Sequence, residues 1–157
     1  LVAAVLLAVL SVLGGLLVHR AGADEARSRV QQERYAAVLS AARAEADAFV
    51  NLRYDRAGEG LRRVGAGATG SFAHKYGAGA AQVRSTLRAN HSVLTGSVLW
   101  AGVVSVDNDT ASVIVATTGT VSNKRTGGRE VARTYRLRLD LVQRDGRWLT
   151  SSLVFVG

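Results

Sequence analysis

The sequence predicts an α+β domain in which about three helices pack on one face of a curved, four-stranded antiparallel sheet, preceded by a transmembrane helix. Three observations support this fold class. Residues 1–18 form an apolar run without a charged side chain. Helical periodicity follows over the first half of the remaining chain, and alternating, β-branched patterns replace it after Asn90. Helices that precede a series of strands joined by short turns are typical of α+β proteins.

The apolar run at the start of the sequence predicts a membrane anchor. As a helix, residues 1–18 would be about 27 Å long, close to the ~30 Å hydrocarbon core of a bilayer. We therefore expect a transmembrane anchor over residues 1–20 and one domain over residues 21–157. A secretory signal peptide is the alternative, because the small residues 21–23 resemble a cleavage site. A retained single span predicts a location in the cell membrane.

The domain begins with a predicted long helix over residues 24–55. Apolar residues recur there at steps of three and four and form a stripe for a core, whereas charged residues such as Glu45 form a polar back. Shorter helices are expected over residues 56–89. The last of them fits residues 71–89, although glycines in its middle weaken it by about 1 kcal/mol each relative to alanine.

Residues 91–156 carry the pattern of a four-stranded antiparallel sheet. The polar turn at residues 107–109 separates the first two strands. The third strand alternates most clearly, with leucines on one face and charged residues on the other. Asp145-Gly146 is a strong hairpin signal before the last strand. Such a sheet twists and curls, so a tapering cavity is expected between the sheet and the long helix.

The composition argues against several kinds of site. The chain has no cysteine, so it forms no disulfide and no cysteine-bound metal site. Its three histidines are far apart and lack the spacing of a zinc site. The net charge of +8 is not gathered into a dense Lys/Arg tract with aromatic residues, so we expect no nucleic acid partner. A positive domain near a membrane is instead expected to attract anionic lipid headgroups.

Four segments carry a family resemblance: AARAEADAFVNLRYD, GATGSFAHKY, VVSVDNDTASVIVATTGTVSN and LRLDLVQRDGRWLTSSLVFV. Together they resemble the Mce-associated membrane proteins of actinobacteria, the accessory proteins of the mammalian-cell-entry (Mce) lipid importers, over about residues 38–156. The order of elements behind one span is also that of the cystatin-like cone shared by SnoaL-like proteins and relatives of nuclear transport factor 2.

The resemblance implies a membrane-anchored, non-enzymatic accessory subunit that assembles with or stabilises an Mce-type lipid or sterol import complex. It transfers no catalytic, cofactor-binding or metal-binding residue, so none is expected. It also implies an extracytoplasmic domain with protein partners. The arginine excess after the apolar run would by itself favour a cytoplasmic domain, but long domains are translocated largely regardless of charge.

Two sets of residues are candidates for function. The side chains expected to line a cavity in the cone are Tyr54, Asp55, Tyr76, Trp100 and Tyr135. The outward residues of the third strand, which form a candidate face for a partner protein, are Arg136, Arg138 and Asp140. An aromatic cavity favours binding of an apolar ligand, whereas a charged strand face favours contact with another protein.

Two other functions remain open beside the accessory subunit. The chain could be a periplasmic scaffold of a type IV secretion or conjugation system, because some inner-membrane components of these systems share the layout of an anchor and a cone. It could also bind an apolar ligand or act as an enzyme, because a cone fold by itself does not establish its use.

Overall fold

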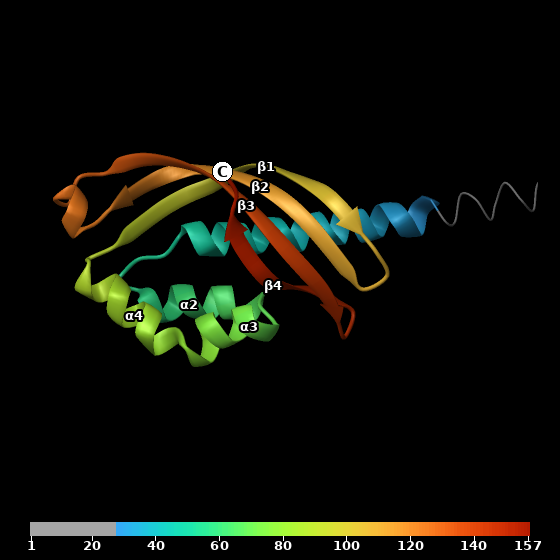
Figure 1. Cartoon of the computed structure of the whole chain (residues 1–157), viewed down its shortest axis with the longest axis horizontal. Helices are drawn as coiled ribbons and strands as arrows, with labels where there is room; N and C mark the ends of the chain where they lie inside the picture. Colours follow the sequence, from blue (N-terminus) through green and yellow to red (C-terminus); the bar gives the residue numbers. More distant parts are fainter. Residues whose placement is uncertain (1–27) are drawn as a thin grey trace, which may run out of the picture. The chain divides into compact units, whose positions relative to one another are not determined.

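The structure, a computed structural model, describes residues 28–157. The predicted anchor over residues 1–20 lies outside the described residues, and no helix within residues 28–157 is long and apolar enough to cross a membrane. The chain divides into two compact units, Leu1–Ala36 and Ala37–Gly157. The fold described below is that of the second unit (Figure 1).

The first helix runs over residues 28–50, and its residues 37–50 belong to the second unit. It ends earlier than the expected residue 55, because Leu52 leaves the helix to pack in an apolar cluster. The C=O of Leu52 accepts a hydrogen bond of 2.8 Å from the N–H of Leu94. The segment after the helix therefore lies along the start of the first strand.

Short helices follow: α2 (Ala57–Ala66), α3 (Gly70–Ala73) and α4 (Ala80–Ala89), with a π-helical turn, His74–Ala78, between the last two. The continuous helix expected over residues 71–89 is thus broken. The N–H of Gly79 donates to the C=O of His74 at 2.6 Å, which is the wider spacing of a π turn. A Cβ at Gly79 would lie 2.8 Å from the C=O oxygen of Lys75, so the glycine permits this break.

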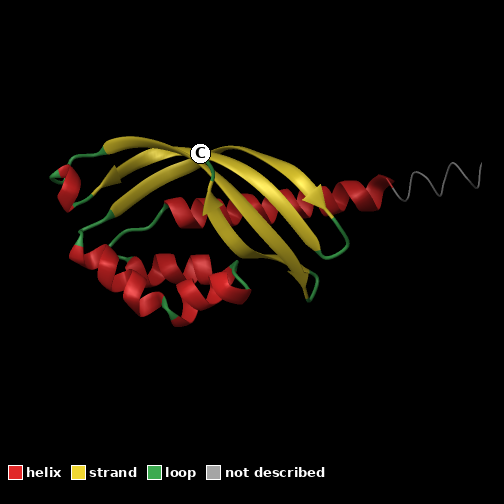
Figure 2. Ribbon diagram, viewed as in Figure 1, coloured by secondary structure: helices red, strands yellow, loops and turns green. Residues whose placement is uncertain are grey.

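Four antiparallel strands form one sheet in the order β1-β2-β3-β4: β1 (Val93–Val106), β2 (Thr110–Ser122), β3 (Val131–Arg144) and β4 (Arg147–Phe155). Figure 2 shows α2, α3 and α4 on one side of the curved sheet. The hairpin expected at Asp145-Gly146 is confirmed, because both residues have positive φ, 50° and 75°, as a two-residue type I′ turn requires.

The sheet and the first helix enclose the main apolar cluster. The leucines of β3 face inward and are fully buried together with valines of β2. The helix meets them with small residues, Val38, Ala42 and Ala46, which let its backbone approach the sheet closely. A second cluster lies among the short helices and includes Leu61, Val64 and Phe72. The predicted α+β architecture, with helices covering one face of a four-stranded antiparallel sheet, is therefore confirmed.

A side-chain clamp fixes the end of the first helix to β1. The amide of Asn51 donates from Nδ2 to the C=O of Gly96 at 2.9 Å and accepts at Oδ1 from the Gly96 N–H at 3.1 Å. Gly96 pairs with Gly119 on β2, and a Cβ at Gly96 would lie 3.1 Å from Val50 Cγ2. Gly96 thus leaves the space that the helix end occupies, and Gly119 leaves space for the backbone of β1.

Replacing Asn51 with alanine is expected to lower the free energy of unfolding by about 1–3 kcal/mol. The change leaves both backbone groups of Gly96 without their partner in a half-buried place. Urea denaturation followed by fluorescence would measure the loss. Asn108, exposed in the turn between β1 and β2, is the matched control, and its replacement with alanine should change stability by no more than about 0.5 kcal/mol. Equal losses in both variants would contradict the clamp.

Candidate functional site

The interior between the short helices and the sheet is occupied by aromatic side chains of the domain itself. Each ring touches the next, with centroids 4.7 to 6.1 Å apart. In spatial order the rings are those of Tyr135, Phe155, Phe49, Tyr76 and Phe72. Rings at these separations are in direct contact. The rings therefore fill part of the space between the short helices and the sheet, and Phe155 remains 59% exposed.

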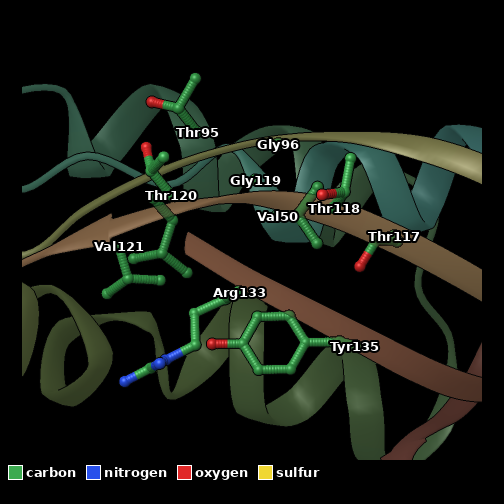
Figure 3. A pocket seen from close by; sticks show the side chains of 11 residues that line it. Val50, Thr95, Gly96, Thr117, Thr118, Gly119, Thr120, Val121, Arg133 and Tyr135 are labelled. Carbon is green, nitrogen blue, oxygen red and sulfur yellow. The ribbon is translucent and has the colours of Figure 1, made fainter. Parts of the chain in front are cut away.

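A small cavity remains beside this row of rings, where the helix end meets the sheet (Figure 3). Val50, Thr117 and Tyr135 are among the residues that line it, and Arg133 stands at its border. Its volume is about 10 Å³, close to the space that one water molecule needs. The Thr117 hydroxyl is buried without a hydrogen-bond partner among the described residues, which suits a single bound water.

The residues expected to line one cavity do not gather around one. Tyr135 lines the small cavity, and Tyr76 is buried in the second apolar cluster. Tyr54 instead stacks on His91, with ring centroids 5.1 Å apart. Asp55 is exposed and pairs with Arg53 at 2.9 Å; this guanidinium holds the pKa of the carboxyl below its usual value.

The prediction that Trp100 lines the cavity is wrong. The Trp100 side chain is 56% exposed and lies on the outer face of the sheet, the face away from the helices. A bulge between Val98 and Trp100 causes the change, because the extra residue Leu99 shifts the register with β2. The indole ring lies over Gly102, where a side chain would collide with it.

The outer face of the sheet carries the residues expected to meet a partner. The register places Trp100, Ala116 and Arg136 in one row across the sheet. A neighbouring row contains Ile114, Arg138 and Val154. We call these six residues the outer patch.

The charged side chains on this face differ in whether they form an ion pair. Asp140 lies on the same face as the outer patch, where it accepts at Oδ1 from Arg138 Nε at 3.1 Å and from the Ser112 hydroxyl at 3.0 Å. Arg136 is exposed, and no acidic side chain lies within salt-bridge distance of it among the described residues. The face therefore combines exposed apolar surface with a net positive charge.

One acidic side chain is buried inside the domain, on the supposed polar back of the first helix. Glu45 is only 3% exposed, and its Oε1 has no hydrogen-bond partner among the described residues. Burial raises the pKa of Glu45 to about 8. The pKa of Tyr76 is raised by burial and then by the negative charge of Glu45. Among residues 28–157, no group of three or more acidic residues and histidines could hold a metal ion.

Solved structures of other proteins share this fold. An IcmL-like type IV secretion system protein from Legionella pneumophila superposes with a TM-score of 0.59 at 12% identity, covering 77% of this chain and 91% of that chain. A ketosteroid isomerase-like protein from Erwinia carotovora superposes with a TM-score of 0.57 at 25% identity, covering 77% and 93%. The cone fold of relatives of nuclear transport factor 2, expected from the sequence, is thereby confirmed.

Sequence comparison finds a relative in Mycobacterium tuberculosis, described as "Uncharacterized protein Rv1363c", which is 28% identical over 126 residues. The match covers 80% of this chain but 48% of the relative, so the chain spans about half the length of that protein. The sequence pattern of a protein family, described as "Uncharacterized protein Rv1363c/MT1408-like", matches residues 1–157.

Proposed function

The chain belongs to the Rv1363c/MT1408-like family, and we propose that it is a membrane-anchored, non-enzymatic subunit that binds other proteins through the outer patch. The complex that we propose is an Mce-type lipid or sterol importer, which this chain would help to assemble or stabilise. The observation that carries the proposal is the outer patch, where the exposed apolar side chains of Trp100 and Val154 lie on the same face as two exposed arginines.

The packed interior favours binding of proteins over catalysis. A lipid or steroid needs a pocket of roughly 300 Å³ or more. The cavity beside Tyr135 holds about 10 Å³. The larger hollow beside the end of the first helix, about 840 Å³, is open to solvent and is bordered by the charged side chains of Asp47, Arg53 and Arg63. Glu45 is only 3% exposed, so a substrate would not reach it in this structure.

The composition of the outer patch suits a protein partner. Tryptophan and arginine contribute most often to the energy of protein interfaces, particularly where apolar surface surrounds them. Trp100 and Val154 are exposed here, and Arg136 lies in the same row as Trp100, with Ala116 between them. The partner that fits is a surface with an apolar depression and carboxylates at its border, because these would pair with the arginines.

Purification of the protein from native membranes tests this function. Trp100→Ala and Arg136→Glu are each expected to reduce co-purification of Mce importer subunits about tenfold or more, because loss of an interface anchor costs roughly 2 kcal/mol. Quantitative mass spectrometry of the eluate measures the recovery. Arg125→Glu is the matched control, because Arg125 is exposed in the short 3₁₀ turn Lys124–Thr126, outside the outer patch.

The outcome also decides between this complex and other partners. Absence of every Mce subunit from the wild-type eluate would refute the proposed complex, and components of a type IV secretion or conjugation system would favour the scaffold function instead. Equal recovery with Arg136→Glu and with wild type would refute the outer patch as the contact surface. These three results separate the identity of the partner from the location of the interface.

We also propose that the domain faces the extracytoplasmic side of the cell membrane, where its net positive charge would attract anionic headgroups. Labelling of intact cells tests the orientation. A cysteine introduced at exposed Asp109 should react with a membrane-impermeant maleimide, since the natural sequence has no cysteine to interfere. Labelling only after cell lysis would place the domain in the cytoplasm.

A further inference from the structure

The last residue of α2 and the connection to α3, residues 66–69 together, are fastened to β4. The N–H of Thr69 donates to the C=O of Thr150 at 2.8 Å, and the N–H of Thr150 donates to the C=O of Gly67 at 2.8 Å. The guanidinium of Arg147 donates to the C=O of Ala66 at 3.1 Å. We call this connection, together with Thr150 and Glu45, the seam. It joins the layer of short helices to the sheet.

Glu45 lies directly beneath this connection. A Cβ at Gly67 would collide with the Glu45 carboxylate, so the glycine lets the backbone pass close over the acid. The Oε1 atom of Glu45 and the hydroxyl of Thr150 are both buried, and neither has a hydrogen-bond partner among the described residues. The seam thus contains polar groups that the closed structure does not satisfy.

A carboxyl group in such a place remains protonated when the structure is closed. Burial raises the pKa of Glu45 to about 8, and no cation lies close enough to lower it again among the described residues. Of the groups around it, the π turn contributes the titratable Tyr76, whose pKa Glu45 raises further. The connection contributes uncharged residues, and β4 contributes Thr150 and Arg147, whose guanidinium binds the C=O of Ala66. An ionised Glu45 would therefore need water, and the connection at Gly67 is a segment that covers its carboxylate.

We propose that Glu45 makes the seam a pH-dependent gate between the layer of short helices and the sheet. With a protonated carboxyl, the connection stays closed on β4. Ionisation favours an open form in which the two backbone hydrogen bonds to Thr150 are broken and water reaches Glu45. This gate does not depend on the proposed partner, because it rests on contacts inside the domain.

The direction of the pH effect follows from the difference in the pKa of Glu45 between the open and the closed form. In the open form the Glu45 carboxyl is hydrated, with its ordinary pKa of 4.5, and in the closed form its pKa is about 8. The closed form is therefore most favoured below pH 4.5. The opening constant rises about tenfold for each pH unit between these two values and becomes constant above pH 8.

Hydrogen exchange of the full chain in detergent, followed by NMR from pH 5 to pH 8, tests the gate. After correction for intrinsic exchange, the opening constants at the amides of Thr69 and Thr150 should rise about tenfold per pH unit. Amides in the middle of the sheet, at Val115 and Leu139, serve as the reference and should show smaller opening constants at every pH.

Two variants distinguish the effect of Glu45 on opening from the effect of other acidic residues. In Glu45→Gln the seam amides should open to an extent that is nearly independent of pH, whereas Glu59→Gln, the same change at an exposed position of α2, should behave as wild type. The proposal is overturned if wild-type seam amides do not respond to pH. It is also overturned if the reference amides have the same opening constants and the same response, because the whole domain would then unfold together. This comparison uses wild type alone, so it holds even for an unstable variant.

Discussion

Glu45→Gln is expected to make the domain more stable than wild type at pH 8, by about 3 kcal/mol. In wild type, unfolding releases the proton of Glu45, because the pKa falls from about 8 in the folded state to 4.5 in the unfolded state. This shift corresponds to roughly 4–5 kcal/mol. The net gain is smaller, because the buried amide of glutamine also lacks a partner.

The raised pKa of Glu45 determines how the free energy of unfolding depends on pH. The protonated carboxyl of Glu45 contributes its full stabilisation of the fold below pH 4.5. This contribution is lost as the pH rises to about 8. The difference in unfolding free energy between Glu45→Gln and wild type should therefore be small at pH 4.5 and largest at pH 8. Urea denaturation at several pH values measures it, with Glu59→Gln as the control. A difference that stays constant with pH would show that Glu45 is not protonated in the fold.

Leu139→Ala is expected to lower the free energy of unfolding by about 2–5 kcal/mol. Leu139 lies in the middle of β3, is fully buried, and pairs with Val113 on β2 and Leu153 on β4. Loss of its side chain leaves a cavity that the two neighbouring strands close only in part, since all their backbone pairs hold them in place.

Leu99→Ala is the matched control for this prediction, because it removes the same atoms from a residue that is 62% exposed. Its effect on stability should stay within about 0.5 kcal/mol. Both variants can be compared by denaturation at pH 6 with tryptophan fluorescence. Similar losses in the two variants would mean that the inner face of β3 does not form the core.

The sheet could be predicted well because the local residue pattern and the packing of the core specify the same strands and turns. Leucine alternation in β3 specifies which face is buried, and Asp145-Gly146 specifies where the chain turns. The sheet expected over residues 91–156 runs from Val93 to Phe155 in the structure, a difference of one or two residues at each end. The helix over residues 71–89 was less predictable, because the close approach of Gly79 to the preceding turn decides where it breaks.

The positions of Trp100 and Glu45 could not be predicted from periodicity. Val98 and Trp100 are two residues apart, so simple alternation places them on the same face, but the bulge at Leu99 sends Trp100 to the opposite one. Glu45 follows the polar pattern of an amphipathic helix. That helix is covered on two sides, by the sheet and by the connection at Gly67, so its polar back is not all exposed.

The bulges in β1 also bear on self-association. β1 is the outermost strand on its side of the sheet, and regular outer strands can recruit further strands and start fibrils. The two register shifts, at Val98/Trp100 and Val103/Ser105, interrupt the even spacing of its free N–H and C=O groups. A strand from another molecule therefore meets no long, regular row to pair with. We therefore expect the bulges to limit aggregation although β1 exposes Leu99, Trp100 and Val104.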